Sequence, residues 1–537
     1  MAVKFDINNI PKEKFTFASR DGSLHDKKLD TKPVGYLKDA WNRFKKNTSS
    51  IIGAVIVIIV IIFAIIGPFC FDSNFQKSYS TNGVDLERYK HLLPKLPFVE
   101  VGSGFWDGTS VEEVNEVNFI KLNARGYETG RNPIVEVVEV YQTEEGKNMY
   151  KVRVDSYSNI GVFNKQLTYS EYKAIQEYQN KTGIQVILPY IDHNKVKFAN
   201  KNDKDYWYAC DIKSNATTLD GKKISGIVSE KDGVYSVAVD KLVPGYLSNY
   251  SAYKDPYDSV RLKGDPGTWY YSLPNGSNDS SFETLNYEVR LDPYNYFVYY
   301  YNGLEPSFVF GSNEKGYDIL SRLALGARFS LLFALGVSII NLFIGAIYGA
   351  IEGYYGGTAD LIMERISDIL AAIPSMIVTV LFNLHLTKYV GVVPALLYAF
   401  ILTGWIGMAS RVRMQFYRFK NQEYVLAART LGARDKRIMF KHIFPNSLGT
   451  IITGSVLVIP GVIFSETSLT YLGIVNLDST TMTSVGAMLN AGKNSLQSFP
   501  HVVLFPAIFI GLLMIAFNLF GNGLRDAFNP SLRGVEE

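Results

Sequence analysis

Three Gly-Lys segments are the places where this chain could bind a nucleotide phosphate. They read AGKNS, DGKKI and EGKNM. A phosphate-binding loop needs another glycine five residues before this pair and a Ser or Thr directly after the lysine. Its backbone N–H groups cradle the phosphates, and the hydroxyl binds Mg²⁺. None of the three segments meets both requirements, so the sequence predicts no ATPase site.

Other catalytic patterns are also absent from the sequence. It contains no His-Glu-x-x-His zinc helix and no Gly-x-Ser-x-Gly nucleophile turn, and its six histidines are scattered. We therefore expect a chain that is not an enzyme and holds no metal or cofactor of its own.

Four residues in apolar segments are candidates for a translocation path or its gating. Glu466 interrupts an apolar run. A carboxylate in hydrocarbon is unfavourable, so Glu466 should face a cavity, a partner or the protein interior, or lie hydrated near the end of its span. Pro374, Pro460 and Gly461 interrupt helical patterns, and such residues allow kinks or hinges.

The most distinctive segment, residues 423–446, reads EYVLAARTLGARDKRIMFKHIFPN. It predicts two short helices, 423–431 and 434–444, with a bend at Gly432 and a stop at Pro445. Their apolar stripes comprise Tyr424, Val425, Ala428 and Leu431 on the first helix, and Ile438, Met439 and Ile443 on the second. Lysines and arginines mark the other side. The pattern favours a rigid knuckle that docks in a partner's groove over a basic loop that only fixes orientation.

This segment lies between long apolar runs that predict membrane helices. The six expected spans are 51–71, 327–352, 366–388, 391–410, 448–473 and 500–520. Glycines at 345, 349 and 353 are spaced by four residues, which allows another helix to approach closely.

Charge predicts the orientation of these spans. Eleven Lys and Arg precede residue 51, and residues 411–447 hold nine against two acids. Basic segments next to spans lie on the cytoplasmic side. We therefore expect a multi-pass protein of the cytoplasmic membrane with both termini inside. The net charge of +9 outside residues 72–310 is explained by this rule, so we expect no nucleic-acid binding.

Residues 72–310 carry 26 Lys and Arg against 32 Asp and Glu, and they alternate apolar and polar residues in short runs. This pattern predicts an α+β domain outside the membrane. Two cysteines, Cys70 and Cys210, would lie on that side, as a disulfide or as two free thiols. The expected organisation is a leader (1–50) with an amphipathic helix around Trp41 and Phe44, span one (51–71), the inserted domain (72–310), a membrane core (311–521) and a cytoplasmic tail (522–537).

The segment AARTLGARDKRIMFKHIFPN resembles the Glu-Ala-Ala loop of permease subunits of bacterial ABC importers. Leu426 stands where that family often has Glu. The resemblance implies that the loop docks on a partner ATPase through Glu423, Ala427, Ala428, Arg429, Thr430, Leu431, Gly432, Ala433, Arg434, Asp435, Arg437 and Pro445.

Other segments resemble the second-permease type of the oligopeptide/dipeptide permease family. They are KDAWNRFKKN, GSNEKGYDILSRLALGARFSLL, DILAAIPSM, ETSLTYLGI and NLFGNGLRDAFNPSLRG. The family has a short link between its first two spans, whereas about 240 residues intervene here. The resemblance implies a type I ABC importer permease with six transmembrane helices, which is an α-helical membrane protein, and the α+β domain is then an insertion.

The resemblance also implies partners. These are a second, homologous permease, two ATPase subunits that bind ATP and Mg²⁺, and an external peptide-binding lipoprotein. The alternatives are a membrane sensor or receptor with an external ligand-binding domain, and a channel or secondary transporter. Co-purification with two ATPases separates them.

Overall fold

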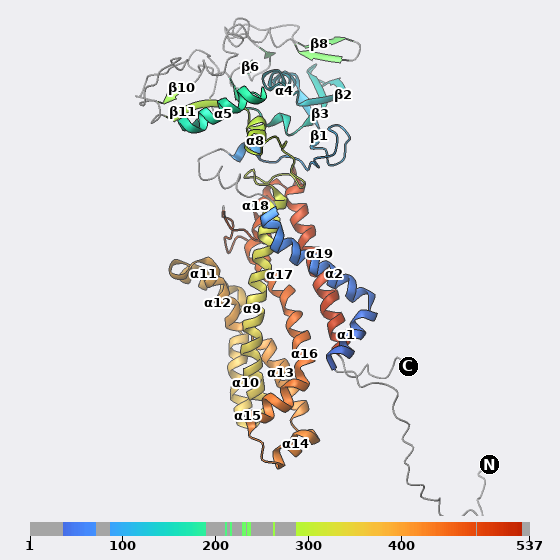
Figure 1. Ribbon diagram of the computed structural model, residues 1–537, viewed down its shortest axis with the longest axis vertical. Coiled ribbons are helices and arrows are strands. Elements are labelled where there is room, and N and C mark those ends of the chain that lie inside the picture. The colour runs from blue at the N-terminus through green and yellow to red at the C-terminus, as the bar shows by residue number, and fades with distance from the viewer. Residues whose placement is uncertain are drawn as a thin grey trace, which may run out of the picture.

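The computed structural model describes residues 36–70, 86–188, 210–211, 215–216, 228–231, 234–237, 261–263 and 286–528, except Thr480. Long helices form an elongated bundle, and a smaller body of strands and short helices lies at one end of it (Figure 1). The predicted tail beyond residue 528 and most of the predicted leader lie outside the described residues. Cys70 is exposed and unpaired among the described residues, and the side chain of Cys210 is not among them.

Five helical segments in the described part are long and apolar enough to cross a membrane. They are α2 (Thr48–Cys70), α9 (Ile319–Tyr355), α12 with α13 (Val392–Gly404 and Ile406–Phe419), Asp435–Tyr471 and α19 (His501–Phe528). A sixth crossing is present if α10 (Gly357–Ala371) and α11 (Ser375–Val390) are counted as one broken span. Short helix α1 (Tyr36–Lys46) precedes α2 and packs Phe44 against Phe520, as expected for an amphipathic leader helix.

The predicted span 366–388 is bent at Pro374, where the sequence indicates an interruption. It begins inside α10 and crosses a break before α11, where the two helices meet at 70°. Pro374 is the N-cap of α11. Proline has no N–H to continue the helix and disfavours helical backbone in the residue before it, so a proline in this run bends the chain.

Two helical segments are longer than the spans predicted within them. Helix α19 continues to Phe528, past the predicted end of its span at residue 520. The segment that contains predicted span 448–473 begins at Asp435, so the second knuckle helix and the span are continuous. Charged residues near a helix end reduce the apolar signal without ending the helix, which explains both differences.

The predicted glycine stripe is confirmed as a helix-packing site. A Cβ atom on Gly345, Gly349 or Gly353 would lie 2.1–2.7 Å from backbone carbonyl oxygens of α13 and the residue before it. Such separations are far below van der Waals contact. These three positions of α9 therefore require glycine, and the close α9–α13 pair forms the base on which residues 423–443 rest.

The inserted body contains two sheets that are larger than hairpins. Strands β1 (Thr109–Asn115), β3 (Asn148–Asp155) and β2 (Ile134–Gln142) form an antiparallel sheet in that order, and α4 (Glu116–Thr129) packs on it through Phe119. The second sheet has the order β10–β11–β4, with β5 also paired to β11. Its strands are β10 (Arg261–Lys263), β11 (Asn286–Leu291), β4 (Phe163–Leu167) and β5 (Ile187–Leu188).

Helices α5 (Tyr169–Thr182) and α8 (Pro293–Tyr300) accompany this second sheet. Two hairpins, β6–β7 (Cys210–Asp211 and Asn215–Ala216) and β8–β9 (Val228–Lys231 and Val234–Val237), complete the described strands. Apolar and polar residues alternate in 133–142 and 149–158, which predicts strands, and these segments form β2 and β3. Gly183 ends α5 in a left-handed conformation, as is typical of a glycine after a helix.

Hydrogen bonds and ring contacts join the inserted body to the membrane core. Ser312 Oγ accepts from the Leu92 N–H at 2.8 Å, and the Trp106 ring lies 5.7 Å from the Phe505 ring of α19. The His91 ring of the inserted body stacks on the Phe499 ring, with 4.1 Å between the ring centres. The insertion is thus fixed both to the end of the bundle and to the segment between α17 (Val458–Tyr471) and α19.

Lys165 makes the stability of the inserted body depend on pH. Its side chain is buried and donates to the Tyr296 hydroxyl at 2.7 Å, and burial lowers its pKa from 10.5 to about 8. Between these values the unfolded chain binds more protons than the folded one. The unfolding free energy therefore rises as pH increases from about 8 to about 10.5, by roughly 3 kcal/mol.

Replacing Lys165 by Met is expected to remove this dependence and to raise the melting temperature of the inserted body at pH 7. Thermal unfolding of the full chain at pH 7 and pH 9.5 measures both effects. An equal pH dependence in the variant and the wild type would show that Lys165 stays charged at pH 9.5.

Candidate functional site

The predicted knuckle lies at the end of the bundle opposite the inserted body (Figure 1). Helix α14 (Glu423–Thr430) is followed by a turn and by α15 (Asp435–Arg437). A π-helical segment (Ile438–Ile443) then leads into α16 (Phe444–Val456). The helix–turn–helix shape agrees with the sequence prediction, while the way the second helix ends does not.

Gly432 ends the first helix in the expected way. Its φ is +79°, its N–H donates to the Arg429 carbonyl, and the Ala433 N–H donates to the Ala428 carbonyl, both at 3.0 Å. These two bonds form a Schellman motif, which requires a left-handed residue at this position. No atom of the residues that the structure describes lies within 4 Å of a Cβ placed on Gly432. Within this chain, glycine is therefore required by the backbone angle and not by close approach.

Pro445 does not stop the second helix, so that prediction is wrong. The proline lies in the first turn of α16, and the chain stays helical through it. The preceding π-helical segment explains how: the Phe444 N–H bonds to the Met439 carbonyl, five residues back. This wider turn accommodates a residue that lacks an N–H and whose ring would clash with a regular α-helical carbonyl.

Most of the predicted apolar stripe faces inward. Val425, Ile438 and Ile443 are fully buried and pack with Val412 and Phe416 of α13. Burying side chains of this size contributes about 1.5–3 kcal/mol each. These residues therefore attach the knuckle firmly to α9 and α13, so movement of the knuckle would be transmitted to those two helices.

Polar contacts also hold the knuckle against α9. The Tyr354 hydroxyl donates to Asp435 Oδ1 at 2.6 Å, and Arg429 Nη2 donates to the same hydroxyl at 3.4 Å. Tyr354 thus joins one residue before the bend to one after it. The sequence analysis missed Tyr354, because no local pattern links it to residues 80 positions away.

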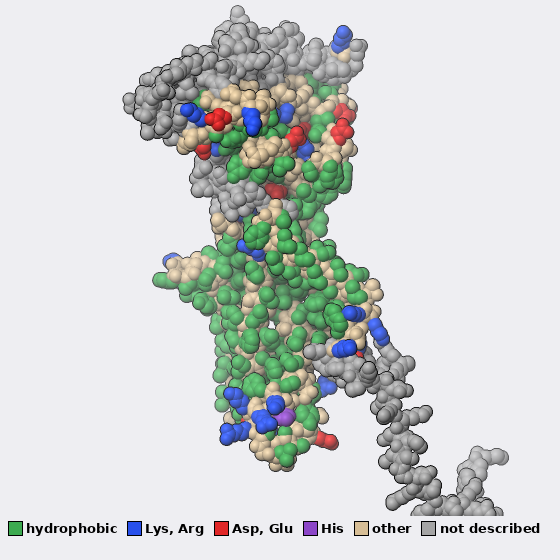
Figure 2. Space-filling view, viewed as in Figure 1, with side chains coloured by type: hydrophobic (Ala, Val, Ile, Leu, Met, Phe, Trp, Pro, Cys, Tyr) green, Lys and Arg blue, Asp and Glu red, His purple; other side chains and the backbone are tan. Residues whose placement is uncertain are grey.

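The outer surface of the knuckle combines exposed apolar side chains, of which Leu431 is the most exposed, with a basic cluster. Leu431 is 88% exposed at the bend. The charged residues beside it, Arg434, Lys436, Arg437 and Lys441, are also exposed, and lysine and arginine side chains gather at this end of the bundle (Figure 2). Four other predicted docking residues are also exposed: Glu423, Ala427, Thr430 and Pro445. Ala433 is half-buried.

A second group of charged residues, which the sequence analysis missed, holds together the helices on which the knuckle rests. Arg413 of α13 binds Asp360 Oδ1 and Oδ2 at 2.7 and 2.9 Å and Glu364 Oε1 and Oε2 at 2.7 and 3.0 Å. Glu352 lies 3.5 Å from the same guanidinium. One arginine therefore joins α13 to both α9 and α10.

The path candidates separate into two groups. Gly461 lines a hollow of about 570 Å³ between α9, α11, α12 and α17, together with hydroxyl side chains from Ser375, Thr379, Thr403, Ser465 and Ser468. Pro374 directly precedes the lining residue Ser375. Pro460 and Glu466 are buried and do not line the hollow.

Glu466 faces the protein interior, one of the environments expected from the sequence. It accepts from Ser330 Oγ of α9 at 2.9 Å and lies 3.4 Å from Thr470 Oγ1. Its neighbours in sequence, Ser465 and Thr467, were not singled out. The repeated hydroxyls at positions 465 and 468 of α17 were the available signal for the hollow.

Two protein-family models match this chain. Residues 341–534 match the family model described as binding-protein-dependent transport system inner membrane component. Residues 35–93 match the N-terminal TM domain of oligopeptide transport permease C. The oligopeptide transport system permease protein OppC of Bacillus subtilis is 43% identical over 224 residues, which are 42% of this chain and 72% of that protein.

The chain belongs to the oligopeptide and dipeptide permease family.

Two further relatives agree with this assignment. The dipeptide transport system permease protein DppC of Bacillus subtilis is 41% identical over 42% of this chain and 69% of its own length. The glutathione transport system permease protein GsiD of Pectobacterium atrosepticum is 34% identical over 46% of this chain and 81% of its own. The protein is thus a multi-pass membrane permease subunit of an ABC transporter, and the sensor and channel alternatives are not supported. Neither family model covers residues 94–340.

Proposed function

We propose that this permease imports oligopeptides or dipeptides and is driven by two ATPase subunits in trans. One ATPase docks on the knuckle, residues 423–446, and the other docks on a second, homologous permease. The observation that carries the proposal is Leu431, exposed on a knuckle whose buried side is fixed to α9 and α13. Exposed apolar side chains rimmed by charged residues mark protein interaction sites, and arginine is enriched at the centres of such interfaces. ATP and Mg²⁺ would bind only to the ATPases.

The orientation follows from the same surface. The basic knuckle end lies in the cytoplasm with both termini, and the inserted body lies outside, in accordance with the charge rule for membrane proteins. The hydroxyl-lined hollow forms this subunit's share of the translocation path, and the second permease supplies the opposite wall. Peptide cargo is taken from the names of the relatives. Co-purification of two ATPases and uptake of a labelled peptide test these statements separately.

Variants at Gly432 distinguish backbone strain from contact with the ATPase. Gly432→Ala is expected to destabilise the turn by about 1 kcal/mol, because a Cβ is disfavoured at positive φ. Gly432→Leu adds bulk on the exposed side and is expected to reduce ATPase co-purification further, as are charge reversals at Arg434 or Arg437. The docking assignment fails if Gly432→Leu retains as much ATPase as Gly432→Ala.

For the inserted body, we propose that it seats the external peptide-binding protein or caps the entrance of the path. Its support is the direct contact of this body with the segment between α17 and α19, where the His91 ring stacks on the Phe499 ring. The Lys95 N–H donates to the Phe308 carbonyl at 2.9 Å, so residues 96–307 can be replaced by a short glycine linker. The deletion is expected to reduce uptake at low peptide concentration while leaving ATPase co-purification intact. Unaltered uptake at all concentrations would reject this role.

A further inference from the structure

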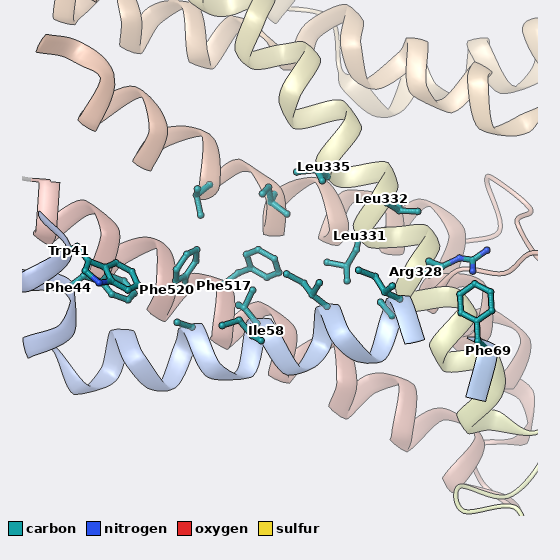
Figure 3. Close-up of a pocket in the computed structure, with 17 residues that line it drawn as sticks. Trp41, Phe44, Ile58, Phe69, Arg328, Leu331, Leu332, Leu335, Phe517 and Phe520 are labelled. Carbon is teal, nitrogen blue, oxygen red and sulfur yellow. The ribbon is translucent and has the colours of Figure 1, made fainter. Parts of the chain in front are cut away.

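An apolar groove of about 800 Å³ runs along the outer side of the bundle between α2 and α9 (Figure 3). Ile58, Ile61 and Ile65 of α2 form one wall, and Leu331, Leu332 and Leu335 of α9 form the other. Trp41 and Phe44 of the leader helix lie at one end, and Phe69 and Arg328 lie at the other.

Arg328 is the one charged residue among those that line the groove in the described part of the chain. Its guanidinium lies 5.8 Å from the centre of the Phe69 ring. It has no carboxylate or hydrogen-bond partner among the described residues, whereas Arg322, two turns earlier on α9, binds Asp478. A half-buried guanidinium at the end of an apolar groove has five N–H donors to satisfy, and a phosphate oxygen is a well-matched acceptor.

The expected depth of Arg328 in the bilayer agrees with a bond to a phosphate oxygen. Helix α2 has 23 residues, so it is about 34 Å long, close to the ~30 Å hydrocarbon thickness of a bilayer. Lys45 and Lys46 lie just before one end of α2, and Phe69 lies in the last turn at the other. Arg328, beside Phe69, therefore lies at the level of the phosphates in the leaflet nearer the inserted body.

The lining and the charge of the groove distinguish between occupants. A helix packed there would place apolar side chains over the charge of Arg328. Flexible acyl chains fit a narrow groove lined by isoleucine and leucine, and a headgroup phosphate fits its charged end.

We propose that this groove is a binding site for an anionic phospholipid, whose phosphate is bound by Arg328 and whose acyl chains lie between α2 and α9. The proposal requires only that the chain is embedded in a membrane, so its failure would leave the proposed ATPase docking untouched.

Native mass spectrometry of the full chain, released from nanodiscs of equal phosphatidylglycerol and phosphatidylcholine, tests the site. The wild type is expected to retain phosphatidylglycerol about tenfold more than phosphatidylcholine. Both lipids offer a phosphate oxygen, but the quaternary ammonium of choline repels the guanidinium and offsets part of that attraction. Arg328→Gln should abolish the preference, and Leu332→Trp, which fills the groove, should reduce retention of both lipids. Arg365→Gln on α10, an exposed arginine paired with Asp368, is the matched control and should behave as wild type.

Equal retention of the two lipids by the wild type, or an undiminished preference in Arg328→Gln, would overturn the proposal. A photo-crosslinking residue at position 332 adds an independent measurement. Crosslinks to lipid support the site, and crosslinks to a helix of another subunit contradict it. Size-exclusion profiles equal to wild type show that the variants are folded.

Discussion

Replacing Leu431 by Asp is expected to remove the ATPase from the purified complex and to abolish peptide uptake. Leu431 projects from the bend of the knuckle and is 88% exposed, so the substitution leaves the fold of the permease intact. In an interface core, a buried anchor of this kind contributes about 2–4 kcal/mol, which corresponds to a loss of affinity of roughly 30-fold to 1,000-fold. Pull-down of the ATPase at several concentrations measures the loss.

Leu304→Asp is the matched control for this prediction. Leu304 is an exposed leucine of the inserted body, and that body lies at the end of the bundle opposite the knuckle (Figure 1). It should leave ATPase binding unchanged. A Leu431→Asp complex that retains its ATPase with wild-type affinity would show that the bend is not part of the interface.

Replacing Arg413 by Gln is expected to have the largest effect on stability. The change removes a guanidinium that binds both oxygens of Asp360 and of Glu364, and it leaves those acids beside buried Glu352 without their cation. The Arg413 side chain is 21% exposed, so solvent screens part of these interactions, and their loss is expected to cost about 1.5–3 kcal/mol, as for hydrogen bonds to charged groups. Thermal unfolding of the purified permease measures the loss, and the knuckle, which rests on α13, should become more susceptible to protease.

Two further variants test the cause of that effect. Arg413→Lys keeps the charge but not the two-pronged geometry, so it should recover part of the stability. Asp360→Asn with Arg413→Gln should be less destabilised than the sum of the two single variants, because they remove the same interaction. Additive losses would show that Arg413 acts through its packing and not through its ion pairs.

The spans, the knuckle and the glycine contacts were predictable because each depends on local pattern. Apolar runs identify the membrane helices, and glycines at 345, 349 and 353 identify a helix contact. Gly432 marks a helix end, since the left-handed backbone there favours glycine. Alternation of apolar and polar residues was enough to place β2 and β3 within the insertion.

Features that depend on distant residues were not predictable. Tyr354 meets Asp435, and Arg413 meets Asp360, only because α9, α10 and α13 pack together. The inward direction of Val425 and Ile438 also depends on that packing, so a stripe that looked free for a partner proved to be partly an internal contact. Pro445 was misjudged because a π-helical turn, which sequence does not signal, absorbs it.

Site-specific photo-crosslinking at position 431 in the assembled transporter tests the central claim most directly. The claim predicts a crosslink from the bend of the knuckle to an ATPase subunit, and none from a control label at position 304. Crosslinks from position 431 to lipid alone, or to no protein, would contradict the assignment of this loop as the contact through which ATP hydrolysis drives the permease.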